Sequence, residues 1–445
     1  MPLSRRRVLT AGAASALAAG TATGCGAARG AAPGPAGPEP VPRGPTTLHW
    51  WSFHMAAKNG GDLRTHLISA FERRHPNITV VSTDLPANTD IIRTTLSTTV
   101  ASGSPRPDVY MGDITWPAQF AHNELALPVG PAVPEGHWQR YPGPLTKALS
   151  ARGTVYAFPL YLDEAFLYYR KDLLHKHGLR VPRSWEEVAR TARRIQRAGD
   201  AEQGLLLQGA VAEGLTANTA EYVADAGGSI LDPSGTRPTF DSRANERALG
   251  YLSELTGSGV LPRAATTFKE QDTMDAFTAG QAVFLRNWSY SWEVIQDPAA
   301  SKVAGRAGAM RRPGFEGGAT EGNSCLGGWC NYINPHSQER GAAIAFARFC
   351  AEEEGQQVLL RHSSYVPALL DALESRAARR SPNPTIALSR KVRLVPRPSQ
   401  TPQYPQVSKA VYTEVNSLLN GASSPRGALS AAQENLRAAL EGNAL

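Results

Sequence analysis

The 445-residue sequence has few cysteines and lacks the common short catalytic motifs. It contains four cysteines, without the Cys-x-x-Cys spacing of zinc sites, and its histidines are scattered, so we expect no metal centre. It has no Gly-x-Ser-x-Gly elbow, no His-Glu-x-x-His motif and no phosphate-binding glycine loop. These absences argue against hydrolase and nucleotide chemistry, and we expect no organic cofactor.

Long apolar runs and a concentrated charge are also missing. No apolar run is long enough to span a bilayer, so the sequence predicts no transmembrane helix. The formal net charge of +7 falls to +4 when residues 1–24, with three arginines and no acid, are left out. This charge is too diffuse to suggest nucleic acid, and the basic stretch at residues 376–393 is typical of a solvated face. We therefore expect no nucleic-acid partner.

The first 25 residues have the pattern of an export signal. Three arginines at positions 5–7 precede a short run of small and apolar residues that leads to Cys25. The arginine pair matches the twin-arginine address, and Cys25 stands where bacterial lipoproteins carry their acylated cysteine. We expect residues 1–24 to be a signal peptide, and Cys25 to be lipidated and to hold the protein on the outer face of the cell membrane. The alternative is an ordinary secretory signal in which Cys25 is incidental.

The body of the protein begins after a linker. Residues 25–46 are mostly Ala, Gly and Pro, and such a composition predicts a flexible tether. The remaining length, about 400 residues, is enough for two domains. Strand-like and helix-like segments then alternate, which predicts an α/β sheet covered on both faces. The strand-like segments are 47–51, 78–81, 108–111 and 153–159, and the helical ones include 61–75, 91–101 and two within 405–443.

Two further local features predict structure. Ser184-Trp185-Glu186-Glu187 is a capping box at the start of a helix, in which we assign Trp185 to packing. Cys325 and Cys330 flank a glycine-rich turn and can form a disulfide outside the cell, whereas Cys350 lies in an apolar helical pattern and is expected to be a buried free thiol.

Three separated segments resemble the extracytoplasmic sugar-binding proteins of ABC importers, the group that includes maltose- and trehalose-binding proteins. They are residues 107–128, residues 153–187, and residues 277–288 together with Gly327-Gly328-Trp329 and the helix expected near 338–360. The second segment is the most specific, and the resemblance spans residues 47–443. It implies an α/β, two-lobed periplasmic-binding-protein-like fold (type II) with a hinge and discontinuous lobes.

The resemblance also implies how the chain is divided and what it does. Lobe one is expected to hold residues 47–158 and 328–370, and lobe two residues 159–327 and 371–445, with crossings near 159–160, near 327–328 and after Pro367. A monomer of this kind is expected to capture a carbohydrate between its lobes and deliver it to permease subunits of an ABC transporter. A disaccharide or oligosaccharide, such as trehalose or an α-glucoside, is favoured.

The residue chemistry is consistent with a sugar site. Sugars present apolar C–H faces and hydroxyl groups, so their sites combine flat aromatic rings with carboxylates, amides and cations. Several of the candidate side chains come just after predicted strands. Open α/β sheets bind their ligands beyond the carboxyl ends of the strands, which is where these side chains are expected to lie. Arg397 resembles a ligand-contacting arginine of the trehalose-type branch. The candidate ligand-binding residues are Trp50, Trp51, Asp113, Trp116, Asp163, Glu164, Trp288, Trp329 and Arg397.

Each candidate has a structural alternative. Any tryptophan can belong to the core, Asp113 can cap a helix that begins near Thr115, and Arg397 can brace a surface loop. At the level of function, the alternatives are a binding protein for a non-sugar solute and a secreted glycoside-acting enzyme. A glycosidase needs two facing carboxylates, but Asp163 and Glu164 are neighbours and would point to opposite faces of a strand.

Overall fold

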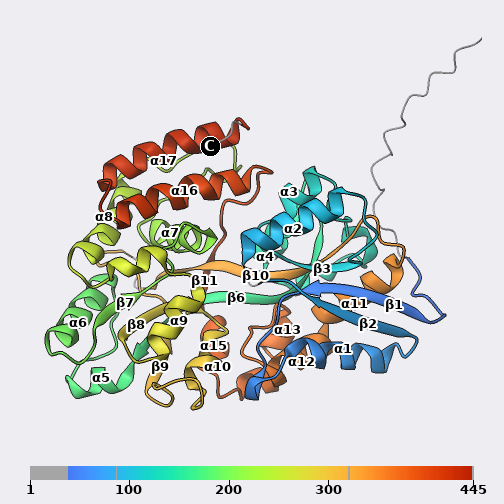
Figure 1. Ribbon diagram of the computed structural model, residues 1–445, viewed down its shortest axis with the longest axis horizontal. Coiled ribbons are helices and arrows are strands. Elements are labelled where there is room, and N and C mark those ends of the chain that lie inside the picture. The colour runs from blue at the N-terminus through green and yellow to red at the C-terminus, as the bar shows by residue number, and fades with distance from the viewer. Residues whose placement is uncertain (1–38, 87, 319–320, 443–445) are drawn as a thin grey trace, which may run out of the picture. The chain divides into compact units, whose positions relative to one another are not determined.

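The computed structural model describes residues 39–86, 88–318 and 321–442 (Figure 1), which all belong to one compact unit spanning 35–445. The predicted signal peptide, Cys25 and residues 25–38 of the predicted linker lie outside the described residues. Within the described part of the chain, none of the helices combines the length and the apolar character needed to cross a bilayer.

The elements alternate as the sequence predicts in the N-terminal part of the body. The strands are β1 (Thr46–Ser52), β2 (Ile78–Asp84), β3 (Val109–Asp113), β4 (Ser150–Ala151), β5 (Thr154–Val155), β6 (Ala157–Arg170), β7 (Gln203–Leu206), β8 (Ala282–Trp288), β9 (Ala307–Met310), β10 (Asn323–Ile333) and β11 (Arg393–Val395). The helices include α1 (Leu63–Arg74), α2 (Thr89–Ala101), α3 (Pro117–His122), α4 (Gly143–Ala148), α5 (Lys171–Lys176), α6 (Trp185–Arg197), α7 (Glu213–Asp225), α8 (Arg243–Gly257) and α9 (Glu270–Thr278). They continue with α10 (Ser291–Gln296), α11 (Arg340–Ala351), α12 (Glu353–His362), α13 (Leu370–Leu373), α14 (Arg376–Arg379), α15 (Pro384–Ser389), α16 (Tyr404–Leu419) and α17 (Pro425–Leu440).

One mixed sheet runs through the described chain, with helices on both of its faces, as predicted (Figure 1). Its strand order is β2-β1-β3-β10-β6-β8-β7, with β11 paired to β10 and β9 paired to β6. The pairs β1–β2, β1–β3 and β7–β8 are parallel, whereas β10 is antiparallel to both β3 and β6. The central strands β6 and β10 therefore connect a parallel half-sheet on each side.

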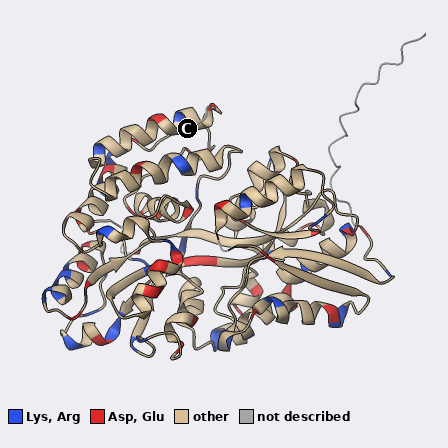
Figure 2. Ribbon diagram, in the orientation of Figure 1, with Lys and Arg blue, Asp and Glu red and all other residues tan. Residues whose placement is uncertain are grey.

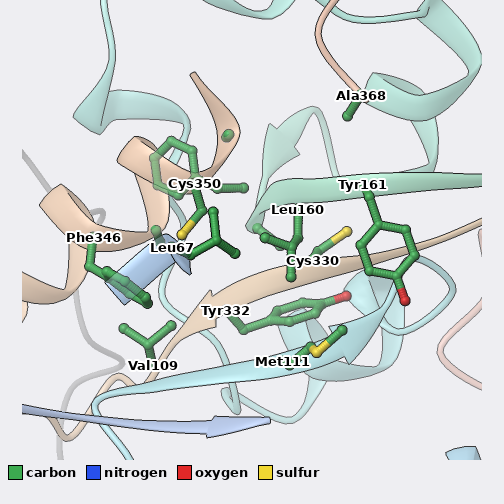
Figure 3. Close-up of a cluster of buried hydrophobic side chains, with 14 of the residues drawn as sticks. Leu67, Val109, Met111, Leu160, Tyr161, Cys330, Tyr332, Phe346, Cys350 and Ala368 are labelled. Carbon is green, nitrogen blue, oxygen red and sulfur yellow. The ribbon is translucent and has the colours of Figure 1, made fainter. Parts of the chain in front are cut away.

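The two largest hydrophobic cores of the described residues lie on either side of the β6–β10 pair. The first core gathers residues from Leu48 to Leu162 and from Leu326 to Ile386, and Figure 3 shows part of it, with Tyr332 between Met111 and Cys330. The second core gathers residues from Leu167 to Phe315 and from Tyr404 to Ala439. Both cores thus draw on distant parts of the chain, which is what discontinuous lobes require.

The strand predicted at 153–159 differs from the structure in a way that matters for the site. A short hairpin, β4–β5, precedes the long strand β6, which continues well past the predicted end. Asp163 and Glu164 therefore lie inside β6 and do not follow it. Acidic residues rarely occur in strand interiors, but every β6 residue except Tyr169 is buried and the ladders to β8 and β10 hold this segment extended.

Two helical predictions also need correction. Ser184 does cap α6, because its Oγ accepts the N–H of Glu187 at 3.1 Å, but the Glu187 carboxylate accepts the N–H of Arg183 and not that of Ser184. The capping box is therefore only half formed. The helix expected near 338–360 is two helices, α11 and α12, because the backbone at Glu352 is extended.

The predicted disulfide between Cys325 and Cys330 is wrong, because both thiols are free and buried. The segment between them is not a turn but the extended strand β10, on which five residues span about 16 Å and place the two side chains on opposite faces. A disulfide needs Cα atoms less than about 7 Å apart. Cys350 is a buried free thiol of the first core, as predicted.

A fully buried ion network ties α7 to β8 and to Arg312 in the segment between β9 and β10. The Glu221 carboxylate accepts hydrogen bonds from Arg286 at 2.7 and 2.9 Å, and it lies 3.2 Å from Arg312. Arg312 also lies 3.2 Å from Asp225. Glu221 and both arginines have fully buried side chains, so each charge depends on its partners for the solvation that it has lost.

We predict that Glu221→Gln lowers the free energy of unfolding by about 3–5 kcal/mol, since it leaves two buried guanidinium groups without a full counter-charge. Urea unfolding followed by circular dichroism measures this effect. The control is Glu254→Gln, which breaks the exposed Arg193–Glu254 pair and is expected to cost less than about 1 kcal/mol. Equal losses in the two variants would contradict the role given to the network.

Candidate functional site

A cavity of about 750 Å³ lies between the two cores, next to the β6–β10 pair. Its walls come from residues at or just after the ends of β1, β2, β3 and β8, from the first turns of α7 and α9, and from the middle of β6 and β10. Six aromatic residues line it: Phe53, Tyr161, Trp288, Tyr290, Trp329 and Tyr365. The charged residues that line it are Asp84, Asp90, Asp113, Asp163, Glu213, Lys269, Glu270, Asp272 and Arg397.

Five of the nine predicted ligand-binding residues line this cavity, although they come from five separate parts of the sequence. They are Asp113, Asp163, Trp288, Trp329 and Arg397. The structure therefore brings these side chains together in one place. Their contact with a ligand stays a prediction.

The other four candidates do not line the cavity. Trp50 is fully buried in the first core, where its indole N–H donates to Asn331 at 3.0 Å. Trp51 is half-buried and packs against the same core. Trp116 is also buried and its ring is 5.9 Å from that of Trp329, so it supports a cavity wall from behind. The fourth is Glu164, which follows Asp163 in β6 and so points to the opposite face.

Trp288 is held in place by close contacts on β10 and β8. A Cβ atom at Gly327 would lie 2.8 Å from the Trp288 ring, so only glycine allows the ring this position. The guanidinium carbon of Arg286 lies 4.2 Å from the centre of the same ring, and Arg286 is itself held by Glu221. The neighbouring Gly328 has φ of +140° and packs against the Tyr161 carbonyl, another position that a side chain would disturb. The glycine pair thus shapes this wall.

Arg397 joins carboxylates from both sides of the cavity. Its Nη2 lies 2.9 Å from Asp113 at the end of β3, and its Nη1 lies 2.7 Å from Glu213 at the start of α7. Glu213 also accepts hydrogen bonds from the hydroxyl groups of Ser408 and Tyr404. Burial raises the pKa of Glu213, and the charge of Arg397 opposes this effect. Arg397 is only 3% exposed, so it is not a brace for a surface loop.

Asp113 also forms a local turn. Its Oδ1 accepts the N–H of Thr115 at 2.8 Å as well as the Arg397 bond. The N-cap of α3 is Trp116, with Pro117 at the first helical position, so Asp113 does not cap that helix. The helix-capping alternative for Asp113 is therefore excluded.

Asp163 is a buried carboxylate on the cavity wall without an ion-pair partner among the described residues. Its Oδ1 accepts the N–H of Ser289 at 3.0 Å and the hydroxyl of Ser289 at 2.7 Å. Burial raises the pKa of Asp163 to about 7, and the negative charge of Glu270 adds to the shift, whereas Ser289 and Arg286 oppose it. The group can therefore change its protonation near neutral pH.

Several cavity residues were missed by the sequence reasoning. Tyr290 lies two residues beyond Trp288 and could have been found by the rule that placed Trp288 past a strand. Tyr161 precedes Asp163 by two residues in β6 and shares its face. Glu213, Glu270 and Tyr365 carry no local signal, because only the packing of α7, α9 and the segment after α12 brings them here.

The two cores, the strands that join them and the cavity between them define a two-lobed α/β binding protein of the periplasmic-binding-protein fold. Residues 57–357 match the model of the bacterial extracellular solute-binding protein family. The chain belongs to this family, and the fold inferred from the sequence resemblance is confirmed.

Individual relatives support the same assignment. The "Probable ABC transporter-binding protein" of Deinococcus radiodurans is 30% identical over 332 residues, which are 72% of this chain and 77% of the relative. The mannitol-binding protein of Pseudomonas aeruginosa is 27% identical over 320 residues, which are 67% and 68% of the two chains. The structure of maltose-bound MalE3 of T. maritima has a TM-score of 0.79 and 26% identity and covers 88% of this chain and 99% of its own.

We predict that Glu164→Gln makes stability less sensitive to pH between about 5 and 8. Burial raises the pKa of Glu164 from its usual 4.5 to about 8, and the charge of Asp163 adds to the shift, whereas a hydrogen bond with Ser389 opposes it. Because the folded state holds this proton more tightly than the unfolded state, the stability that it contributes is present below pH 4.5 and is lost as pH rises to 8.

The measurement is urea unfolding at a series of pH values. The wild-type free energy of unfolding should fall more steeply than that of the variant, by up to about 1.4 kcal/mol per pH unit. Glu353→Gln, at an exposed position on α12, is the control and should keep the wild-type slope. A variant slope equal to the wild-type slope would show that Glu164 does not hold an extra proton.

Proposed function

We propose that this protein captures a sugar or polyol between its two lobes and delivers it to the permease subunits of an ABC importer. The observation that carries the proposal is the cavity beside the β6–β10 pair, in which aromatic rings and buried carboxylates face one space. Its volume of about 750 Å³ lies within the range of roughly 300–1,000 Å³ that is common for small-molecule sites. A disaccharide or short oligosaccharide, such as trehalose or another α-glucoside, is the favoured cargo.

The cavity has the two kinds of group that a sugar needs. Trp329 and Trp288 offer flat faces on which the C–H side of a sugar ring can stack, while Asp163 and Asp113 can accept hydrogen bonds from hydroxyl groups. Trp329 is itself supported by the edge of Phe53, whose ring centre lies 4.7 Å away. The mannitol-binding relative and the maltose-bound structural relative support a polyhydroxylated ligand.

We propose that the lobes close on the ligand about a hinge formed by β6 and β10. Side chains of residues 48–162 pack in the first core and those of 167–315 in the second, which supports lobes divided near the predicted crossings. The third crossing is best placed after Ile386 rather than after Pro367, because Ala372, Leu373 and Ala378 also belong to the first core. Binding drives such a closure to the extent that the ligand prefers the closed form.

The proposed location is the outer face of the cell membrane. The family is extracellular, which supports export, and a lipid on Cys25 with the linker at 25–46 would hold the monomer near its permease. Twin-arginine export of the folded chain is part of the same proposal.

The proposal is tested by a thermal-shift screen of the body against neutral sugars, polyols, amino acids and peptides. A ligand present at about 100 times its dissociation constant should stabilise the protein by about 2.7 kcal/mol. The same ligand should reduce the radius of gyration measured by small-angle X-ray scattering, as the lobes close. Stabilisation by peptides or amino acids alone would refute the carbohydrate assignment, and turnover of a glycoside would favour an enzyme.

We predict that Trp329→Ala weakens the binding of the best sugar in the screen by about tenfold or more. The ring would provide a stacking surface whose loss costs at least about 1.4 kcal/mol. Isothermal titration calorimetry measures the effect. Trp292→Ala removes a half-buried indole outside the cavity lining and should leave the dissociation constant unchanged. A similar loss in both variants would mean that stacking on Trp329 is not part of binding.

A further inference from the structure

The cavity is strongly acidic, although the chain as a whole is basic. Seven of the residues that line it are Asp or Glu and two are Lys or Arg, in a chain of formal net charge +7. Figure 2 shows acidic positions in red on β6 and α9 near the middle of the sheet, with blue positions on the outer helices. The acidic character is therefore a local property of the site.

Four of these carboxylates have cationic partners. Asp84 lies 2.7 Å from Arg64, and Asp90 lies 3.5 Å from Arg93. Asp113 and Glu213 share the single charge of Arg397. The remaining three are Asp163, Glu270 and Asp272, which have no salt bridge among the described residues.

Asp163 and Glu270 are the two that matter for a ligand. Asp272 and Lys269 are exposed at the start of α9, where solvent screens both charges. Asp163 is buried and Glu270 is half-buried, and both line the same cavity without an ion-pair partner among the described residues. Removing them from water without a counter-charge is costly.

Aromatic rings line the cavity together with these two carboxylates. Tyr290 and Tyr365 are both part of the same lining. The Tyr365 ring lies 6.3 Å from that of Tyr290 and 4.2 Å from that of Tyr161. Tyrosine faces attract cations. Trp288 already has the Arg286 cation at 4.2 Å from its ring centre, so it is better suited to stacking on an uncharged part of a ligand.

We propose that the preferred ligand is a sugar or polyol that carries a protonated amine, with the ammonium group held by Asp163 and Glu270 beside Tyr290 and Tyr365. This inference rests on the proposed function and refines its ligand class. A neutral sugar can bond to both carboxylates through hydroxyl groups, but it leaves their negative charges unbalanced when the lobes close. An ammonium group supplies hydrogen-bond donors and the missing positive charge together.

The test compares amino sugars with their neutral counterparts by titration calorimetry on the body of the protein at neutral pH and low salt. The pairs are glucosamine with glucose, galactosamine with galactose, and the glucosamine disaccharide of chitosan with cellobiose. We expect the amino member of at least one pair to bind about tenfold or more tightly, with an advantage that shrinks as salt is added. Neutral members that bind as tightly as their amino partners overturn this inference and leave the proposed function intact. The proposed function fails as well if the protein binds none of these six compounds and none of the sugars and polyols of the thermal-shift screen.

Variants then locate the charge that is recognised. Glu270→Gln and Asp163→Asn should each reduce the ratio of amino-sugar to neutral-sugar affinity by about tenfold, a ratio that a general loss of folding does not change. Asp241→Asn removes the same charge at an exposed position outside the cavity lining and should keep the wild-type ratio. An unchanged ratio in both cavity variants would show that these carboxylates do not select a cation.

Discussion

The antiparallel pairing of β6 with β10 is the constraint on which the rest of the structure depends. The strand β6 runs from the first core into the second, and β10 runs from the first core to the small cluster around Cys325 and Trp288, so their ladder joins the two halves of the sheet. The pairing places Gly327 opposite Asp163, and the absence of a side chain there lets the Trp288 ring approach. The β6–β10 pairing therefore determines three features: the division between the cores, the position of the Asp163 carboxylate and the aromatic wall formed by Trp288.

Stability and binding are connected through buried charge. Glu221 holds Arg286, and Arg286 lies against the back of Trp288, so an ion network in the second core also fixes a cavity wall. Asp163 differs from Glu221, because neutral donors from Ser289 and no direct cation satisfy it. The buried carboxylate of Asp163 thus has no ion-pair partner among the described residues on the cavity wall. Such a group costs folding free energy in the empty state and gains most from a partner that balances it.

Much of the fold could be predicted from the sequence, because strands such as β1 to β3 alternate with helices that have clear boundaries. The end of β6 could not, since the acidic pair Asp163-Glu164 reads locally as the end of a strand and only the ladders on both sides keep it extended. The same limit applies to the predicted disulfide: a Gly-Gly pair usually marks a turn, but here it makes room for a ring inside a strand. Cavity residues at the ends of strands could be found from the sequence. Glu213 and Tyr365 could not, because only contacts between segments far apart in the sequence bring them to the cavity.

The reactivity of the three buried thiols reports on local unfolding of the protein. Cys330 and Cys350 lie in the first core and Cys325 lies next to Trp288 beside the second, and none of the three has exposed surface. Burial raises the pKa of Cys325 to about 12, so the thiolate that reacts with an alkylating reagent is scarce as long as the protein is folded. Each half of the chain therefore becomes modifiable only when its own packing is lost, and the order in which the sulfur atoms react would distinguish the loosening of one lobe from that of the other.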